Sequence, residues 1–355
     1  PKNPVWSEMP MDVIQKIFTH LPVESIYNFR RVSKDFNNLL SSQKFLSALN
    51  RSGRAWLLFR DRKERNYVAY SFLTRTFKTI SLSFLPQFGN SDFYYESCGR
   101  GLLLQHFTRS NAIYVCNPLN RTYSKLGKCS TLGYKRIAGI FDGDDTASYK
   151  IILIVDYSSI QVYNSREDSL TTVGYIPDRK GYYQERNLFW KGYLILGMQH
   201  AHPDFRAYII VYTIPDFVSY FSVALPVKSW MRFRLIKCRS SVVGVELSRK
   251  EPETITVWEF DQKIPSWKEI GRVPLFFFRG NDDFNLDDCV GVEDYICFFL
   301  VEHNHGKKRA IVYDLKQRSW EYLRFNCCLP LTRRRFPSYK PLAFEPMSDI
   351  VLSNT

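Results

Sequence analysis

Two short histidine motifs are the residues of this sequence with the clearest capacity for chemistry. The chain reads His-Ala-His at 200–202 and His-Asn-His at 303–305, and a His-x-His pair can chelate a transition metal. Neither motif has a carboxylate or a cysteine placed to complete a ligand set, which favours the alternative of exposed loop histidines. We therefore predict neither a metal centre nor a bound cofactor.

Acidic residues form the second group that could do chemistry. The run Asp-Gly-Asp-Asp at 142–145 imitates the start of a calcium-binding loop but lacks the glutamate that such loops carry at their twelfth position. We interpret it as a hairpin turn between two apolar runs. The P-loop, GxSxG and HExxH motifs are also absent from the sequence. These observations predict a protein without catalytic residues.

The charge balance points to a class of partner. The chain has 49 Lys and Arg against 35 Asp and Glu, a formal net charge of +14. Such an excess favours an acidic or phosphorylated protein segment, or nucleic acid, as the partner. The alternative is a basic protein whose surplus charge only keeps it in solution.

Cysteine usage and hydropathy indicate the compartment. The eight cysteines show no CxxC spacing and no regular framework, as expected for reduced thiols of a cytosolic or nuclear protein. The sequence contains no run of about 18 apolar residues, which a membrane-spanning helix would need. We expect a protein of the nucleus, the cytoplasm or both, with no membrane partner.

Residues 6–50 carry a helical pattern of apolar side chains. Pro10, Pro22 and Ser33 stand where three helices would begin, and a short fourth is expected at 43–49. The first helix has one broad apolar face. It is formed by Val13, Ile14, Ile17, Phe18 and Leu21. Because the segment is short, it cannot bury all of this apolar surface by itself. We therefore expect an exposed apolar patch of the kind that is typical of a protein interface. The patch is expected to contain Met9, Ile14, Phe18 and Leu21.

After Gly53 the pattern changes to short β-type runs, and it repeats. Each copy has a strand end, a polar turn and an aromatic residue in the next strand, except that the third copy has Leu170 there. The copies begin at Tyr70, Cys116, Tyr163, Tyr212, Trp258 and Tyr313. Six copies at intervals of 46 to 55 residues predict a six-bladed propeller with four strands a blade. Each copy would supply the third and fourth strands of a blade, which we call c and d. The apolar runs upstream of the copies would be the second strands, called b.

The first blade lacks its first strand, which we call strand a, because the residues that precede this blade belong to the helical region. The segment from Tyr339 to Pro346 has strand character and no blade of its own. We predict that it supplies the missing strand and closes the ring, so that no sheet edge stays open at the junction.

The helical segment resembles an F-box. The resemblance rests on Met9-Pro10, Ile17-Phe18, Leu21-Pro22 and Val32-Ser33-Lys34, with Phe36 where the family usually has tryptophan. The repeats, with "CNPLNRTY", "VWEFDQKIPSWKEIG" and "AFEP", are similar to the kelch-type propellers of land-plant F-box proteins, the group that includes Unusual Floral Organs. The resemblance implies an α+β multi-domain chain. It would comprise a helical F-box domain at 1–50 and an all-β six-bladed propeller at 51–355, closed by a C-terminal strand.

This family implies a non-catalytic substrate-recognition subunit of an SCF-type E3 ubiquitin ligase. In such complexes the F-box binds a Skp-type adaptor, through which cullin and RING subunits join, and the propeller binds the target. Some family positions must instead pack the three helices together. The adaptor-binding positions implied here are Met9, Pro10, Val13, Ile14, Ile17, Phe18, Leu21, Pro22, Ile26, Val32, Ser33, Lys34, Phe36 and Leu39.

The charge surplus falls on one side of the predicted propeller. In an antiparallel blade the loops between strands b and c, and those that lead from strand d to the next blade, emerge on the same face. These segments hold twice as many basic as acidic residues, and arginine suits carboxylate or phosphate recognition. Three clusters of candidate target-binding residues result: Arg60, Arg62, Lys63 and Arg65; Lys307, Lys308 and Arg309; and Arg333, Arg334 and Arg335. The alternative is solvated loop charge.

Three functions remain open at this stage. The first is the ubiquitin-ligase receptor, with an acidic, phosphorylated or DNA-associated target protein. The second is a non-degradative F-box adaptor that helps a transcription factor engage DNA through the basic face. The third is a propeller enzyme such as a sugar oxidase or hydrolase, which would require convergent carboxylates or metal ligands at the axis.

Overall fold

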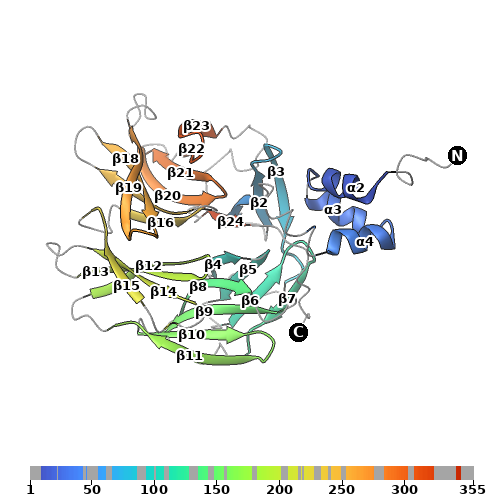
Figure 1. Ribbon diagram of the computed structural model, residues 1–355, viewed down its shortest axis with the longest axis horizontal. Coiled ribbons are helices and arrows are strands. Elements are labelled where there is room, and N and C mark those ends of the chain that lie inside the picture. The colour runs from blue at the N-terminus through green and yellow to red at the C-terminus, as the bar shows by residue number, and fades with distance from the viewer. Residues whose placement is uncertain are drawn as a thin grey trace.

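The computed structural model shows helices in the N-terminal region and strands throughout the rest of the chain (Figure 1). The residues that it describes are 9–21, 23–42, 45, 55–60, 66–85, 93–99, 101–107, 112–127, 135–142, 148–155, 158–177, 182–200, 207–214, 217, 220–227, 233–238, 241–248, 253–275, 284–302, 308–323 and 341–344.

Three short helices, α2 (Met11–Phe18), α3 (Val23–Arg30) and α4 (Lys34–Ser41), form the N-terminal region. The hydroxyl oxygen of Ser33 accepts a hydrogen bond from the backbone N–H of Phe36 at 3.1 Å, so Ser33 is the N-cap of α4, as predicted. The predicted fourth helix lies outside the described residues, except for Phe45. None of the described helices is long and apolar enough to cross a membrane.

The described strands form six antiparallel sheets of four strands each, as the repeat predicted. We number these blades in chain order and call the strands a to d from first to last. Blade 1 has β24 (Leu342–Phe344), β1 (Trp56–Arg60), β2 (Asn66–Ser71) and β3 (Thr76–Ser81). Blade 2 has β4 (Phe93–Gly99), β5 (Leu102–Phe107), β6 (Ala112–Asn117) and β7 (Thr122–Lys125). Blade 3 has β8 (Lys135–Asp142), β9 (Tyr149–Val155), β10 (Ser159–Asn164) and β11 (Ser169–Tyr175).

The other three blades follow the same order. Blade 4 has β12 (Tyr182–Trp190), β13 (Tyr193–His200), β14 (Tyr208–Thr213) and β15 (Tyr220–Ala224). Blade 5 has β16 (Phe233–Lys237), β17 (Val242–Ser248), β18 (Thr254–Asp261) and β19 (Ser266–Pro274). Blade 6 has β20 (Phe284–Val292), β21 (Tyr295–Glu302), β22 (Lys308–Asp314) and β23 (Ser319–Leu323).

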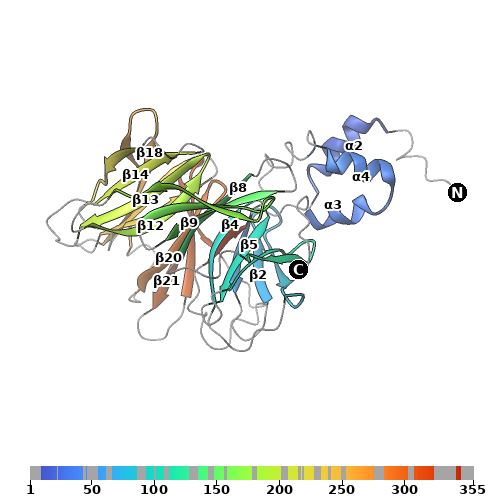
Figure 2. The same ribbon diagram turned by 90° about the horizontal axis from the view of Figure 1, so that it is seen from below.

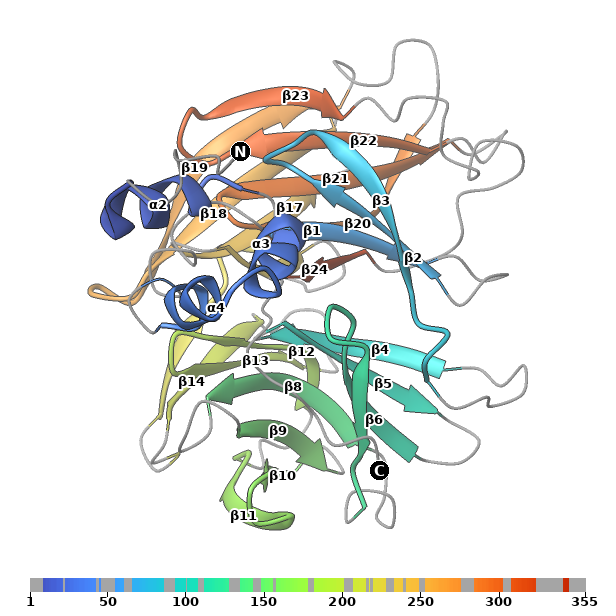
Figure 3. The same ribbon diagram turned by 90° about the vertical axis from the view of Figure 1, so that its right-hand side faces the viewer.

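The a strands line the middle of a closed ring. They contact one another in the cyclic order β24, β4, β8, β12, β16, β20 and back to β24. The main apolar clusters lie between neighbouring sheets; one, for example, joins Leu57 and Phe59 of blade 1 to Val292 and Phe299 of blade 6. The fold is therefore a six-bladed β-propeller. The three helices stand to one side of it, next to blades 1 and 2 (Figures 2 and 3).

The C-terminal strand closes the ring as predicted. In blade 1, β24 pairs antiparallel with β1, and Leu57 faces Ala343 on one side and Tyr70 on the other. Phe344 is fully buried, and its ring centroid lies 5.9 Å from that of Trp56. The first and last strands of the propeller therefore share one sheet, which couples the two ends of the chain.

The repeated turn has a physical explanation in its first residue. In four blades an Asn or Asp ends strand c, and its side-chain oxygen accepts backbone N–H groups two or three residues later. These residues are Asn117, Asn164, Asp261 and Asp314. In blade 1 the hydroxyl of Ser71 accepts the N–H of Thr74 in the same way. Such Asx and ST turns specify the hairpin locally.

The repeated aromatic residues pack across each hairpin and between blades. The ring pairs Tyr70–Phe77, Tyr114–Tyr123, Tyr212–Tyr220, Phe260–Trp267 and Tyr313–Trp320 each join strand c to strand d of one blade. Two of the tyrosines also reach the preceding blade. The hydroxyl of Tyr313 donates to the carbonyl of Ile270 at 2.9 Å, and that of Tyr212 donates to the carbonyl of Tyr175 at 3.2 Å. The aromatic position thus supports both the hairpin and the ring.

Close packing of the a strands requires glycine at position 291. A Cβ at Gly291 on β20 would collide with the backbone carbonyl oxygen of Lys237 in blade 5, which cannot move as a side chain can. We expect Gly291→Ala to lower the free energy of unfolding by about 1–3 kcal/mol, as overpacked cores do. A Cβ at Gly127 meets no atom within 4 Å, so Gly127→Ala is the matched control. Equal melting temperatures for the two variants would contradict this packing.

Candidate functional site

The N-terminal helices have an apolar core of their own. Its five buried residues are Ile14, Phe18, Ile26, Leu40 and Phe45. Around Phe18 the rings of Phe29 and Phe36 lie with centroids 5.0 and 5.2 Å away. Arg30 of α3 donates from Nε to the Asn37 side-chain oxygen of α4 at 3.3 Å. The described core residues all come from this region, so the helices pack as a unit beside the propeller.

The apolar face of α2 is wider than this core can cover. At about 100° a residue, an arc of about 160° runs from Val13 through Ile17, Ile14 and Phe18 to Met11. Ile14 and Phe18, in the middle, are 1% and 0% exposed, whereas Val13 and Ile17 at one edge are 41% and 37% exposed. Met11 at the other edge is 45% exposed. The edges of the arc therefore present apolar surface to solvent.

A further exposed apolar residue lies between α3 and α4. Val32 is 66% exposed, and the adjoining Ser33 and Lys34 are also exposed. Large apolar side chains at this exposure are the usual mark of a protein-contact surface when they occur together.

The fourteen positions that the F-box resemblance implies fall into three groups. Ile14, Phe18 and Ile26 are buried; Met9, Leu21, Phe36 and Leu39 are partly buried against the same core. Pro10, Val13, Ile17, Val32, Ser33 and Lys34 are exposed, and Pro22 lies outside the described residues. The expected patch of Met9, Ile14, Phe18 and Leu21 is therefore wrong for Ile14 and Phe18, which pack the helices together.

Sequence reasoning missed Met11. This residue stands three positions before Ile14 on the apolar arc of α2 and is half exposed. The helical period alone could have included it, since it lies within about 20° of Phe18 on the helical wheel.

The basic clusters predicted for the propeller lie mostly outside the described residues. This holds for Arg62, Lys63, Arg65, Lys307, Arg333, Arg334 and Arg335. The backbone places Arg60 as the last residue of β1, and Lys308 and Arg309 as the first two of β22. Strand b ends and strand c begins on the same face in every blade, so these three positions share a face. The assignment of these clusters to target binding stays a prediction.

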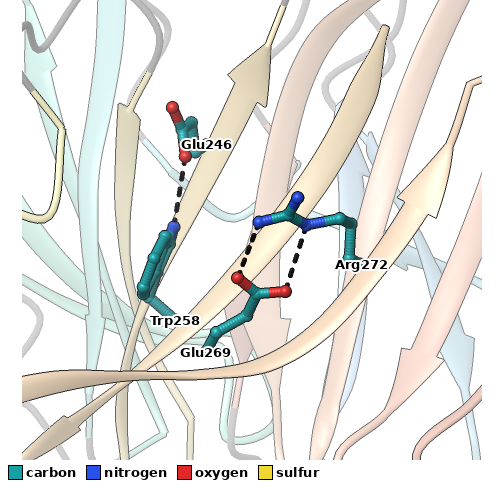
Figure 4. Close-up of polar contacts among 4 residues, drawn as sticks. All are labelled: Glu246, Trp258, Glu269 and Arg272. Atoms are coloured by element: carbon teal, nitrogen blue, oxygen red, sulfur yellow. Dashed lines mark hydrogen bonds and ion pairs between the residues drawn. The ribbon is translucent and has the colours of Figure 1, made fainter. Parts of the chain in front are cut away.

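Elsewhere on the propeller, the guanidinium of Arg272 is paired with a carboxylate of the same strand. On β19 the guanidinium of Arg272 makes two hydrogen bonds to the Glu269 carboxylate, of 3.1 and 2.7 Å (Figure 4). Residues three apart on a regular strand point to opposite faces, but an irregularity in the pairing of β18 with β19 after Val257 turns these two side chains to one side. Nearby, Trp258 Nε1 donates to Glu246 at 3.4 Å. This guanidinium is thus engaged within the protein.

Residues that could have supported enzymatic chemistry give no assembled site in the described part of the chain. His200 ends β13, Asp142 ends β8, and the other motif residues lie outside the described residues. The described His, Cys, Asp and Glu residues form no group able to hold a metal ion. Burial raises the pKa of the Cys238 and Cys297 thiols, which keeps them protonated and unreactive.

Comparison with known proteins identifies the helical region. Residues 6–48 match the F-box domain family. The N-terminal helices are an F-box domain. The chain combines this domain with a six-bladed propeller, and it is similar to F-box/kelch-repeat proteins of Arabidopsis thaliana.

Three relatives from Arabidopsis thaliana span both regions of the chain. F-box only protein 6 is 22% identical, and the match covers 96% of this chain and 74% of the relative. An F-box/kelch-repeat protein is 23% identical, with 97% and 90% covered. Protein UNUSUAL FLORAL ORGANS is 20% identical, with 89% and 78% covered. The similarity therefore extends over both the helical region and the propeller, along nearly the whole length of this chain.

Proposed function

We propose that this protein is the substrate-recognition subunit of an SCF-type E3 ubiquitin ligase. The F-box domain at residues 6–48 carries this proposal, since an F-box implies a Skp-type adaptor and, through it, cullin and RING subunits. The propeller would bind the target protein. The chain would contribute binding and positioning to ubiquitin transfer, with catalysis left to other subunits.

The strand order supports a division of labour between the two faces of the propeller. Ala55 directly precedes β1, a b strand, so the chain from the F-box enters at the face that carries the a–b and c–d turns. We call this the linker face, and the opposite one, with the b–c loops, the far face. A target on the far face would not compete for space with the adaptor on the F-box.

The charge of the chain supports an acidic or phosphorylated target. The net charge is +14, and the segments between strands b and c, or between blades, hold twice as many basic as acidic residues. Attraction between such a surface and an acidic partner speeds association and depends on salt. Target binding should therefore weaken steeply between low and physiological salt.

Reversal of one basic cluster tests this part of the proposal. Replacing Arg333, Arg334 and Arg335 with glutamate should weaken capture of the target at least about tenfold, because like charges then oppose its approach. The matched control reverses Arg121, Arg166 and Lys263, which are exposed on the c–d turns of the linker face. Binding would be measured by pull-down from plant extract at two salt concentrations. Equal capture by both variants would remove this cluster from the target site.

Adaptor binding tests the proposal as a whole. The purified chain should co-elute with a recombinant Skp adaptor in size-exclusion chromatography, and with the N-terminal part of a cullin once the adaptor is present. Separate elution of chain and adaptor at micromolar concentrations would refute the receptor role. A DNA shift assay with a captured transcription factor would distinguish the non-degradative adaptor from the ubiquitin-ligase receptor.

A further inference from the structure

A buried carboxylate joins the last blade to the point where the chain enters the propeller. Glu293 lies in the two-residue turn between β20 and β21 of blade 6, on the linker face. Its Oε1 accepts a hydrogen bond of 2.7 Å from the backbone N–H of Ala55, the residue before β1 of blade 1. The two residues are 238 positions apart, and Glu293 is only 9% exposed. A backbone group at the entry to the propeller is thus held by a side chain from the other end of the chain.

The turn itself does not require an acidic residue. Blade 4 makes the corresponding two-residue turn with Lys191 and Gly192, and there the first residue is exposed. Both first residues have positive φ, +45° for Lys191 and +58° for Glu293, a conformation that favours glycine or asparagine. Glu293 keeps this unfavourable conformation and is also buried beside Ala55. Its side chain therefore has a role that the hairpin does not explain.

The residues around Glu293 hold the turn in place. The neighbouring Asp294 carboxylate forms an ion pair of 2.7 Å with Lys316, and its backbone carbonyl accepts the N–H of Leu315 at 2.9 Å. At the boundary between blades 6 and 1, Phe72 of blade 1 stacks on Tyr295 of blade 6, with ring centroids 4.7 Å apart and planes 7° apart. The acceptor for the Ala55 N–H is thus attached to a turn that is supported within blade 6 and against blade 1.

We infer that Glu293 is a positioning residue that fixes where the chain leaves the propeller toward the F-box. The segment before Ala55 connects the two domains. With Ala55 held to blade 6, the chain has less freedom to pivot about the start of β1. The F-box would then keep a defined direction relative to the linker face. The inference concerns the connection between the domains and needs no assumption about the partner of either one.

Hydrogen exchange and a distance measurement test this inference on the full chain. In Glu293→Ala the Ala55 amide should exchange roughly tenfold faster or more, because its acceptor is gone. Glu293→Gln keeps an oxygen at the same place and should remain close to wild type. Glu321→Ala removes an exposed carboxylate of the same blade and serves as control. Spin labels on ketone-bearing residues at positions 34 and 264, both exposed, should give a distance distribution that is narrow in wild type and about twice as wide in Glu293→Ala.

Each outcome decides for or against the inference. Thermal melts would first establish that the variants keep a folded propeller; if Glu293→Ala does not, the width of the wild-type distance distribution decides, since the inference requires it to be narrow. Fast exchange and a broad distribution confined to Glu293→Ala support the positioning role. Unchanged exchange at Ala55, or a wild-type distribution already as broad as that of Glu293→Ala, would overturn it.

Discussion

Replacing Val13 and Ile17 with aspartate is expected to weaken binding of the Skp adaptor more than about 100-fold. Both side chains lie on one edge of the apolar arc of α2 and are 41% and 37% exposed in the free chain. If the adaptor covers them, each lost aliphatic contact costs roughly 1.5–3 kcal/mol, and each buried carboxylate without a partner adds to this. Two such losses exceed about 3 kcal/mol, which corresponds to more than a hundredfold change in affinity.

The fold of the variant should remain intact because neither side chain belongs to the buried core. Ile264→Asp, at an apolar residue of the propeller that is 71% exposed, is the matched control and should bind the adaptor normally. Titration calorimetry with purified adaptor gives the affinities, and thermal melts compare stabilities. The prediction fails if the double variant binds within about threefold of wild type. Alanines at Leu21 and Pro22 test the interface less sharply, since Leu21 packs on the core.

Removal of the closing strand is expected to abolish cooperative folding of the propeller. A chain that ends at Pro341 lacks β24, and with it the buried Phe344 and the pairing to β1. Loss of a buried phenylalanine alone costs about 3–5 kcal/mol, a large share of the roughly 5–15 kcal/mol that stabilises a domain. The truncation also leaves β1 as an open sheet edge, which promotes aggregation.

A chain that ends at Ser348 keeps the strand and serves as control for this truncation. Calorimetric melts should show a cooperative transition for the control and a broad or absent one for the shorter chain. A shorter chain that melts within about 3 °C of the control would show that β24 contributes little to closure.

The fold could be predicted from the sequence because its signals are local. Asn117, Asn164, Asp261 and Asp314 each cap the turn that follows them, so the repeat marks one hairpin in each of those four blades. Ring closure followed from counting strands, since blade 1 lacked one and the C-terminal tail had one to spare. The N-cap at Ser33 was likewise readable, because capping involves only the next three residues.

The candidate site was harder to predict because an apolar arc does not say which part of it the core will cover. Ile14 and Phe18 differ from Val13 and Ile17 only by their place on α2, and the packing of Phe29 and Phe36 on Phe18 decides which pair is buried. The contact between Glu293 and Ala55 could not be read at all, since 238 residues separate its partners. Burial and long-range polar contacts depend on the assembled fold.

The most direct test of the substrate-receptor proposal is the ubiquitination of proteins captured by the propeller in plant cells. Cells would express either wild-type protein or the Val13→Asp, Ile17→Asp variant, and the captured proteins would be compared for ubiquitin attached to lysine. The proposal predicts at least one protein that both forms capture equally but that is ubiquitinated mainly with wild type. Equal ubiquitination of every captured protein with both forms would contradict it.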